Sequence, residues 1–351
     1  MKPARADMLS HPLIVRLEDC RWSAARERFL RNTQPAGVLL SDPLPPSAEE
    51  TRELLFRIAN ALPRPPLLAI RQEGGTCDPL RRFLPALPSP RAAAQKDLSA
   101  VARLGEIIGE ALSHLGFNTN FAPTLDLGPN TFGSDPVAVA QCGGAFLRGL
   151  KQHRIRACGK HFPGLGSVPL EQSPACRASG KPMAALWRED LLPFRELLPQ
   201  LPMVLISSAA YKAYDFHELR PASRAPQIVE GLLRIKMGYR GLALAYDLDA
   251  ERTGGPLPVG EAAIQSLNAG CDLLVLDLEA SCETVCKALH AELESGRLSR
   301  ARVEQALGRI RTAQQGLRLP PRTVSRRALE GLARRMESFA REVGCEEGKI
   351  A

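Results

Sequence analysis

Short apolar runs recur along the chain, and each is followed by a turn and a stretch with helical periodicity. Eight runs predict strands at residues 12–18, 36–42, 66–72, 118–127, 155–161, 202–208, 241–247 and 272–277. Most of them are apolar on both sides of the pleat, which is typical of parallel strands buried on both faces. Because strand and helix alternate eight times, we expect an α/β protein with a closed (β/α)8 TIM barrel.

Amphipathic patterns predict the helices between these strands. In residues 92–115 apolar side chains recur near a spacing of 3.6 residues. Similar patterns predict helices at 47–61, 136–153, 183–198, 225–237, 258–269 and 281–294, and two more at 299–316 and 325–343. The last two helices follow the eighth strand and each opens with Ser as a helix cap. We therefore expect a barrel over residues 1–320 and a C-terminal helical extension, 321–351, packed on its outside.

Composition excludes some classes of protein. The 351 residues are 44% hydrophobic and 24% charged, and no segment approaches the roughly 20 unbroken apolar residues that span a membrane. Without an apolar signal segment at the start, we expect a cytoplasmic protein that does not bind membranes. The nine cysteines include no CxxC spacing, so reduced thiols are expected, with no metal and no cofactor.

The net charge of +8 would suit a nucleic-acid-binding protein. However, the arginines are spread over the whole chain, and only 5% of residues are aromatic, which leaves few rings for bases to stack on. Nucleic acid is therefore not the expected partner.

Catalytic groups of such barrels lie at the carboxyl ends of the strands and in the loops that follow. Those positions hold RQEGG (71–75), FAPTLDL (121–127), KHFPGLG (160–166), SSAAYKAYD (207–215) and AYDLDA (245–250). The segments are rich in charged and hydroxyl side chains, so they are the candidate site.

In order and spacing, the segments QEGG, NFAPTLDL, FGSDP, GKHFPGLG, GLLRIKMGYRGL and AGCDLLVL resemble glycoside hydrolase family 3 over residues 10–318. The chain is most similar to the single-domain bacterial β-N-acetylglucosaminidases (β-N-acetylhexosaminidases), which trim cell-wall fragments during peptidoglycan recycling. The resemblance implies a TIM barrel, a carbohydrate ligand and retaining hydrolysis, in which a carboxylate attacks the sugar and a second group protonates the leaving oxygen.

The catalytic positions depart from the family pattern. By the resemblance, the nucleophile is an Asp at the position of Tyr246, and Asp247 comes one residue later. Neighbouring side chains of a strand point to opposite faces, so Asp247 would point away from the sugar unless the backbone bulges. The acid/base His is matched by Ser173, and Glu171 stands where the family has the supporting Asp.

The sugar-binding positions are also altered. Arg71 replaces an Asp and Asn130 replaces an Arg, whereas Lys160 and His161 match the family. The nearby carboxylates, Glu73 and Asp126, complete the candidate binding set.

One interpretation is an impaired or inactive homologue that keeps a binding pocket. Arg71 with Lys160 and His161 would make the pocket mouth cationic, which suits an acidic sugar, a muropeptide carboxylate or a sugar phosphate. The alternative is that Arg71 pairs internally with Glu73, Asp126 or Asp247 and closes the pocket.

Two further hypotheses remain. An active hydrolase could use Asp247 as nucleophile and Glu171 as acid, or Tyr246 as nucleophile, since sialidases use a tyrosine. A scaffold protein could instead bind a protein partner through its basic outer helices, which carry Arg297, Arg300, Arg302, Arg309, Arg311, Arg326, Arg327, Arg334 and Arg335.

Overall fold

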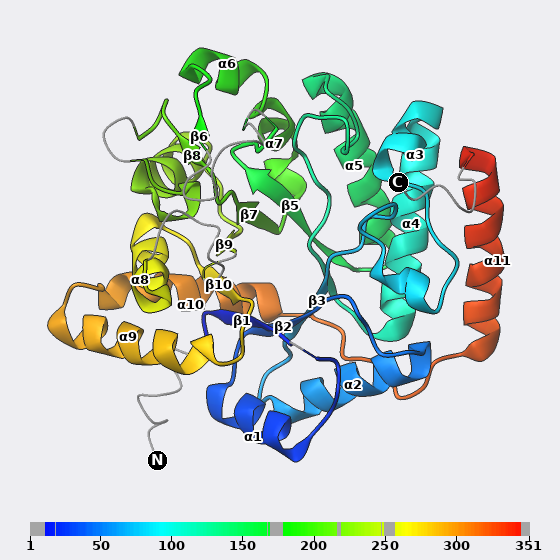
Figure 1. Cartoon of the computed structure of the whole chain (residues 1–351), viewed down its shortest axis with the longest axis horizontal. Coiled ribbons are helices and arrows are strands. Elements are labelled where there is room, and N and C mark those ends of the chain that lie inside the picture. Colours follow the sequence, from blue (N-terminus) through cyan, green and yellow to red (C-terminus); the bar gives the residue numbers. More distant parts are fainter. Residues whose placement is uncertain are drawn as a thin grey trace.

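The computed structural model describes residues 11–17, 19–166, 168, 178–215, 219–246, 248 and 257–344. Eight parallel strands close into a barrel in the order β1-β10-β9-β7-β5-β4-β3-β2, so the predicted fold class is confirmed (Figure 1). The strands are β1 (Leu13–Arg16), β2 (Gly37–Leu40), β3 (Leu67–Ile70), β4 (Thr119–Asn120), β5 (Arg156–Phe162), β7 (Met203–Ile206), β9 (Leu242–Ala245) and β10 (Leu273–Leu276).

Each barrel strand lies within, or one residue from, a run predicted from the sequence. The residues of β2, β3, β7, β9 and β10 are all buried, as expected for strands between a filled barrel interior and a ring of helices. The closing pair joins β1 to β10, with Ile14 opposite Val275. A separate two-stranded sheet, β6 (Ala178–Ser179) with β8 (Ala210–Tyr211), was not expected.

The helices agree with the prediction less closely. The sequence pattern missed α1 (Ala24–Thr33) because Leu30 is the helix's one buried residue, which leaves too narrow an apolar stripe to detect. The single helix predicted at 92–115 divides into α3 (Pro90–Lys96) and α4 (Leu98–Leu115). Asp97 is extended at the break, and its side chain accepts from Ala100 N to cap α4.

The other outer helices are close to their expected positions. Their bounds are α2 (Ala48–Ala61), α5 (Pro136–Gln152), α8 (Val259–Ala269), α9 (Ser281–Ser295), α10 (Arg300–Gln314) and α11 (Arg326–Val343). The helix predicted at 183–198 is broken into α6 (Met183–Arg188) and α7 (Leu192–Leu197), followed by the short η3 (Leu198–Gln200). The stretch predicted at 225–237 winds as a π-helix, η5 (Gln227–Lys236), and two single turns complete the set, η2 (Pro79–Arg82) and η4 (Ala222–Arg224).

The last helix packs on the outside of the barrel, against α4 and α3 (Figure 1). It buries Leu329, Leu332, Met336 and Phe339. Ion pairs from Arg103 to Glu342 and from Arg335 to Glu110 flank this contact.

The boundary between the barrel and the C-terminal extension at residue 320 stays a prediction. Within the described parts of the chain, no helix combines the length and the apolar character needed to cross a bilayer.

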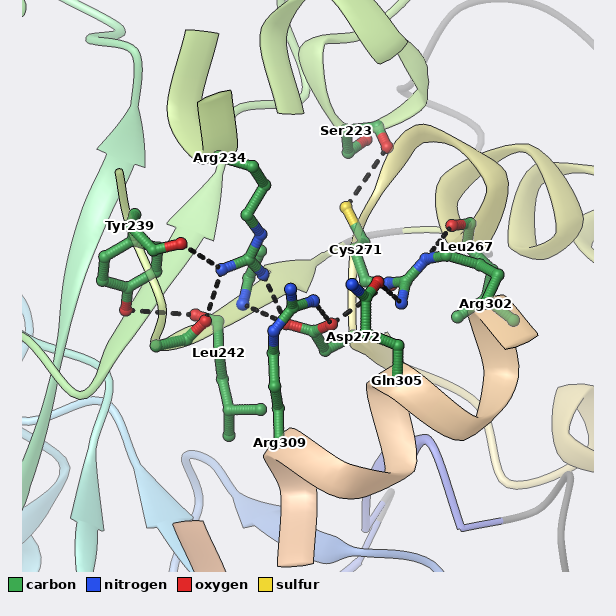
Figure 2. A network of polar contacts seen from close by, with 12 residues as sticks. Ser223, Arg234, Tyr239, Leu242, Leu267, Cys271, Asp272, Arg302, Gln305 and Arg309 are labelled. Carbon is green, nitrogen blue, oxygen red and sulfur yellow. Dashed lines mark hydrogen bonds and ion pairs between the residues drawn. The ribbon is translucent and has the colours of Figure 1, made fainter. Parts of the chain in front are cut away.

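Three arginines converge on one buried carboxylate, Asp272, directly before β10 (Figure 2). Arg234 of η5 lies 2.5 Å from Oδ2, and Arg309 and Arg302 of α10 lie 2.9 Å and 3.1 Å from Oδ1. Ala243 N of β9 also donates to Oδ2. The network therefore connects η5, β9, β10 and α10. Two arginines that the sequence suggested for a protein partner, Arg302 and Arg309, are used inside the fold, and a third, Arg335, pairs with Glu110 of α4. The partner role of the others stays a prediction.

We expect Asp272→Asn to lower the free energy of unfolding by about 3–5 kcal/mol, because it leaves buried guanidinium groups without their carboxylate. Urea unfolding followed by circular dichroism measures this change. Glu330→Gln is the matched control, because its partner Arg326 is 89% exposed, and surface pairs contribute within about 1 kcal/mol. Equal midpoints for the two variants would contradict the role of the network.

Candidate active site

The candidate residues that the structure describes lie mainly at the carboxyl ends of β3, β4, β5 and β9, and β7 separates β9 from the other three in the barrel. Arg71 directly follows β3, Tyr246 directly follows β9, and Lys160 and His161 lie in the last part of β5. Asp126 lies in the segment that leaves β4. The parallel barrel brings these positions to one rim, as the sequence predicted.

Lys160 and Glu73 form a buried ion pair. Lys160 Nζ lies 2.5 Å from Glu73 Oε1 and donates to Phe121 O at 2.6 Å, and both side chains are under 10% exposed. The other donors to Glu73 are Thr124 N at 2.7 Å and Thr124 Oγ1 at 2.9 Å. Burial alone would raise the pKa of Glu73, but the Lys160 ammonium and the Thr124 donors outweigh it, so this pKa is lowered.

A second pair joins Asp126 to His161. Asp126 Oδ1 accepts from His161 N and Leu165 N, and Oδ2 lies 2.7 Å from His161 Nδ1. Burial would raise the pKa of Asp126, but the charge and hydrogen bonds of His161 outweigh it, and the pKa is lowered. An ionised carboxylate can only accept, so Nδ1 carries the proton. His161 is 29% exposed, so its ring is within reach of a polar ligand.

Arg71 and Tyr246 contact each other across the rim. The guanidinium carbon of Arg71 lies 5.7 Å from the centroid of the Tyr246 ring, at a cation–π distance. Of the internal partners suggested for Arg71, Glu73 and Asp126 are engaged by Lys160 and His161 instead. The third suggested partner, Asp247, lies outside the described residues. Among the residues that the structure places, Arg71 thus has an aromatic contact rather than an ion pair.

The remaining candidates are not brought into this cluster. Asn130 is exposed in the loop after β4, and within the described chain it makes no polar contact with the others. Glu171, Ser173 and Asp247 lie outside the described residues, so their suggested roles stay predictions.

Sequence reasoning missed two residues that hold this rim together. Thr124 fixes both oxygens of Glu73. The Tyr211 hydroxyl donates to Gly164 O at 2.7 Å and lies 3.1 Å from Ser207 Oγ, so it ties the loop after β5 to the loop after β7. Burial raises the pKa of Tyr211, which therefore stays protonated as a donor. Both residues lie in segments that the sequence assigned to the candidate site, FAPTLDL and SSAAYKAYD. Their hydrogen-bond partners, however, cannot be predicted from those segments.

We expect Lys160→Met to lower the free energy of unfolding at pH 7 by about 3–5 kcal/mol, because it leaves Glu73 buried and unpaired. In the wild type the pKa of Glu73 is lowered on folding, so its contribution is complete at pH 7 and is lost as pH falls through about 4. In the variant the pKa of Glu73 would instead be raised. The difference between the two proteins should therefore shrink between pH 7 and pH 4 in urea unfolding.

Two further variants test this explanation of the pair. Lys160→Met with Glu73→Gln should recover part of the loss, because no buried charge remains. Lys287→Met is the control, because Lys287 forms a surface pair with Glu283 in which both side chains are more than 70% exposed. A pH-independent difference between Lys160→Met and the wild type would contradict the ion-pair account.

Comparison with known proteins agrees with this geometry. The model of the glycosyl hydrolase family 3 N-terminal domain matches residues 14–313. A β-hexosaminidase of Alkalilimnicola ehrlichii is 34% identical over 288 residues, which are 77% of this chain and 81% of that protein. A β-hexosaminidase of Pseudomonas aeruginosa is 30% identical over 283 residues, which are 76% of this chain and 83% of that protein.

Solved structures show the same relationship. A glycoside hydrolase family 3 β-N-acetylglucosaminidase from Paenibacillus sp. superposes with a TM-score of 0.85 at 25% identity, over 96% of this chain and 68% of that chain. LpqI of Mycobacterium tuberculosis superposes with a TM-score of 0.81 at 26% identity, over 90% of this chain and 94% of that chain. The resemblance seen in the sequence is thus confirmed, and the chain is a β-hexosaminidase-like member of glycoside hydrolase family 3.

Proposed function

We propose that this protein binds an acidic amino sugar at the carboxyl end of its barrel and has lost efficient hydrolysis. The observation that carries the proposal is the contact between Arg71 and Tyr246. By the resemblance, these two positions hold a sugar-binding Asp and the nucleophilic Asp in the family. A cation and a phenol that pack together replace both carboxylates.

The two candidate carboxylates that the structure describes, Glu73 and Asp126, do not offer a substitute nucleophile. Glu73 is under 10% exposed and its oxygens accept from Lys160 and Thr124. Asp126 is equally buried and accepts from His161 and from Leu165 N. Attack on a sugar needs a carboxylate with a free, accessible oxygen, and retaining hydrolysis needs a second group as acid. The pairing of Glu73 with Lys160 and of Asp126 with His161 therefore supports a loss of activity.

The same pairing supports an anionic ligand. Because Lys160 and His161 engage Glu73 and Asp126, the described candidate partners of Arg71, the guanidinium of Arg71 has an aromatic neighbour in Tyr246. A guanidinium presents a planar set of donors that matches a carboxylate or a phosphate. The relatives named β-hexosaminidases suggest an amino sugar as the neutral part of the ligand. An acidic fragment of peptidoglycan, met in the cytoplasm, would combine both features.

Hydrolysis of a chromogenic β-N-acetylglucosaminide by the purified protein tests the loss of activity. We expect no turnover above the uncatalysed rate. Asp247→Asn and Tyr246→Phe are assayed in parallel, because these residues would carry a relocated mechanism together with Glu171. Turnover by the wild type that either variant abolishes would show that the catalytic groups have moved, and it would end the proposal of lost activity.

Isothermal titration calorimetry tests the ligand. We expect N-acetylmuramic acid to bind more tightly than uncharged N-acetylglucosamine, and Arg71→Gln to weaken the acidic sugar at least tenfold, since a charge-assisted hydrogen bond contributes about 1.5–3 kcal/mol. The neutral sugar should be affected much less. Arg322→Gln, an exposed change outside the rim, is the control. Equal affinities for the two sugars in the wild type would argue against an anionic ligand.

A further inference from the structure

A groove of about 580 Å³ lies at the opposite end of the barrel from the candidate active site. Two of its lining residues stand directly before adjacent strands, Leu201 before β7 and Gly241 before β9. These strands pair in parallel, with Met203 opposite Leu242, so the groove lies at their amino ends. Catalytic groups of such barrels lie at the carboxyl ends, which makes this a separate site.

The groove is lined by three cations and no carboxylate. Arg195 comes from α7, Lys236 ends η5, and Arg240 lies in the loop before β9. Within the described chain none of the three forms an ion pair. Glu196, the neighbour of Arg195 in the sequence, does not line the groove, and Glu189 is paired with Lys181. Three cations without counter-ions produce a positive potential that favours an anion.

A tryptophan positions two of these cations. The Arg195 guanidinium lies 4.5 Å and the Lys236 ammonium 4.2 Å from the centroid of the Trp187 ring. Arg195 Nη1 also donates to Trp187 O at 3.2 Å. These contacts hold charges from α7 and η5 at the wall of one groove.

The loop before β9, residues 238–241, forms the floor of the groove, and hydrogen bonds from buried side chains hold it in place. Arg234 donates to Tyr239 O at 3.1 Å and to Gly241 O at 2.6 Å, and its other nitrogen is held by Asp272 (Figure 2). The Tyr239 hydroxyl donates to Leu201 O at 3.1 Å, which ties the two strand entries together. A side chain at Gly241 would collide with this hydroxyl. The groove is therefore pre-formed, as ligand sites usually are.

We propose that this groove is a second binding site, for a small organic molecule that carries phosphate groups. A phosphate group suits the positive charge of the groove, because its oxygens can accept hydrogen bonds from several cations at once. The volume falls within the range of about 300–1,000 Å³ that is typical of small-molecule sites. Leu198, Pro199 and Met237 add an apolar wall for the body of the ligand. The proposal does not depend on the function proposed for the other end of the barrel.

Trp187 makes the site observable by fluorescence. The chain has two tryptophans, Trp22 and Trp187, and Trp22 lines a different cavity. In a Trp22→Phe background the emission therefore comes from the groove. We expect inorganic pyrophosphate, titrated at constant ionic strength, to change this emission with saturation. A hexose phosphate should bind at least tenfold more tightly than the free hexose.

Charge variants assign the binding to the groove. Lys236→Gln with Arg240→Gln should weaken pyrophosphate at least tenfold, and both residues are exposed, so the fold should be kept. Arg322→Gln with Arg327→Gln removes the same charge from another exposed surface and should change nothing. Arg71→Gln should also leave the affinity unchanged, which separates this site from the proposed acidic-sugar pocket.

Several results would overturn the proposal. They are a titration without saturation, an unchanged affinity in the Lys236→Gln/Arg240→Gln protein, and a loss of binding in Arg71→Gln. The proposal would also be overturned if a short RNA bound through Lys236 and Arg240 and pyrophosphate did not. The groove would then be part of a nucleic-acid-binding surface.

Discussion

The carboxylate of Asp272 is the point on which one side of the barrel depends. It is fully buried, and it neutralises part of the charge of three arginines that reach it from η5 and α10. A buried charge must be paired and hydrogen-bonded or it opposes folding. The carboxylate is paired in this way, and it also accepts from the backbone of β9. Helix, strand and loop are thereby held in one arrangement, including the loop before β9 that forms the floor of the cationic groove.

Much of the fold could be predicted from the sequence because parallel barrel strands are short, apolar on both faces and separated by regular helical patterns. The prediction failed where a helix shows little of that pattern. In α1 a single residue, Leu30, is buried, so the sequence shows no clear apolar stripe there. The break at Asp97 was missed because helical periodicity continues on both sides of it, and the cap function of that side chain depends on backbone angles.

The sequence could predict where the candidate site lies, but not which of its charged side chains form ion pairs with each other. The strand pattern placed Arg71, Lys160 and Tyr246 at the carboxyl ends of strands, where the structure has them, because those ends follow from the fold. The sequence could not show which cation forms an ion pair with which carboxylate. Glu73 was a possible partner of Arg71, and the structure pairs it with Lys160, because the segment after β3 and the last part of β5 bring these two side chains together. Sequence spacing contains no information on such contacts between strands.

The ion pair of Lys160 and Glu73 has a consequence for how relatives of this chain are recognised. Both residues belong to the most legible family segments, GKHFPGLG and QEGG, yet here each one satisfies the buried charge of the other. In this chain the pair is part of the fold, whether or not the barrel cleaves a sugar. Searches that weight these segments would therefore collect catalysts and non-catalysts alike. The residues directly after β3 and β9, Arg71 and Tyr246, depart from the pattern of the resemblance, so they bear more directly on the question of activity.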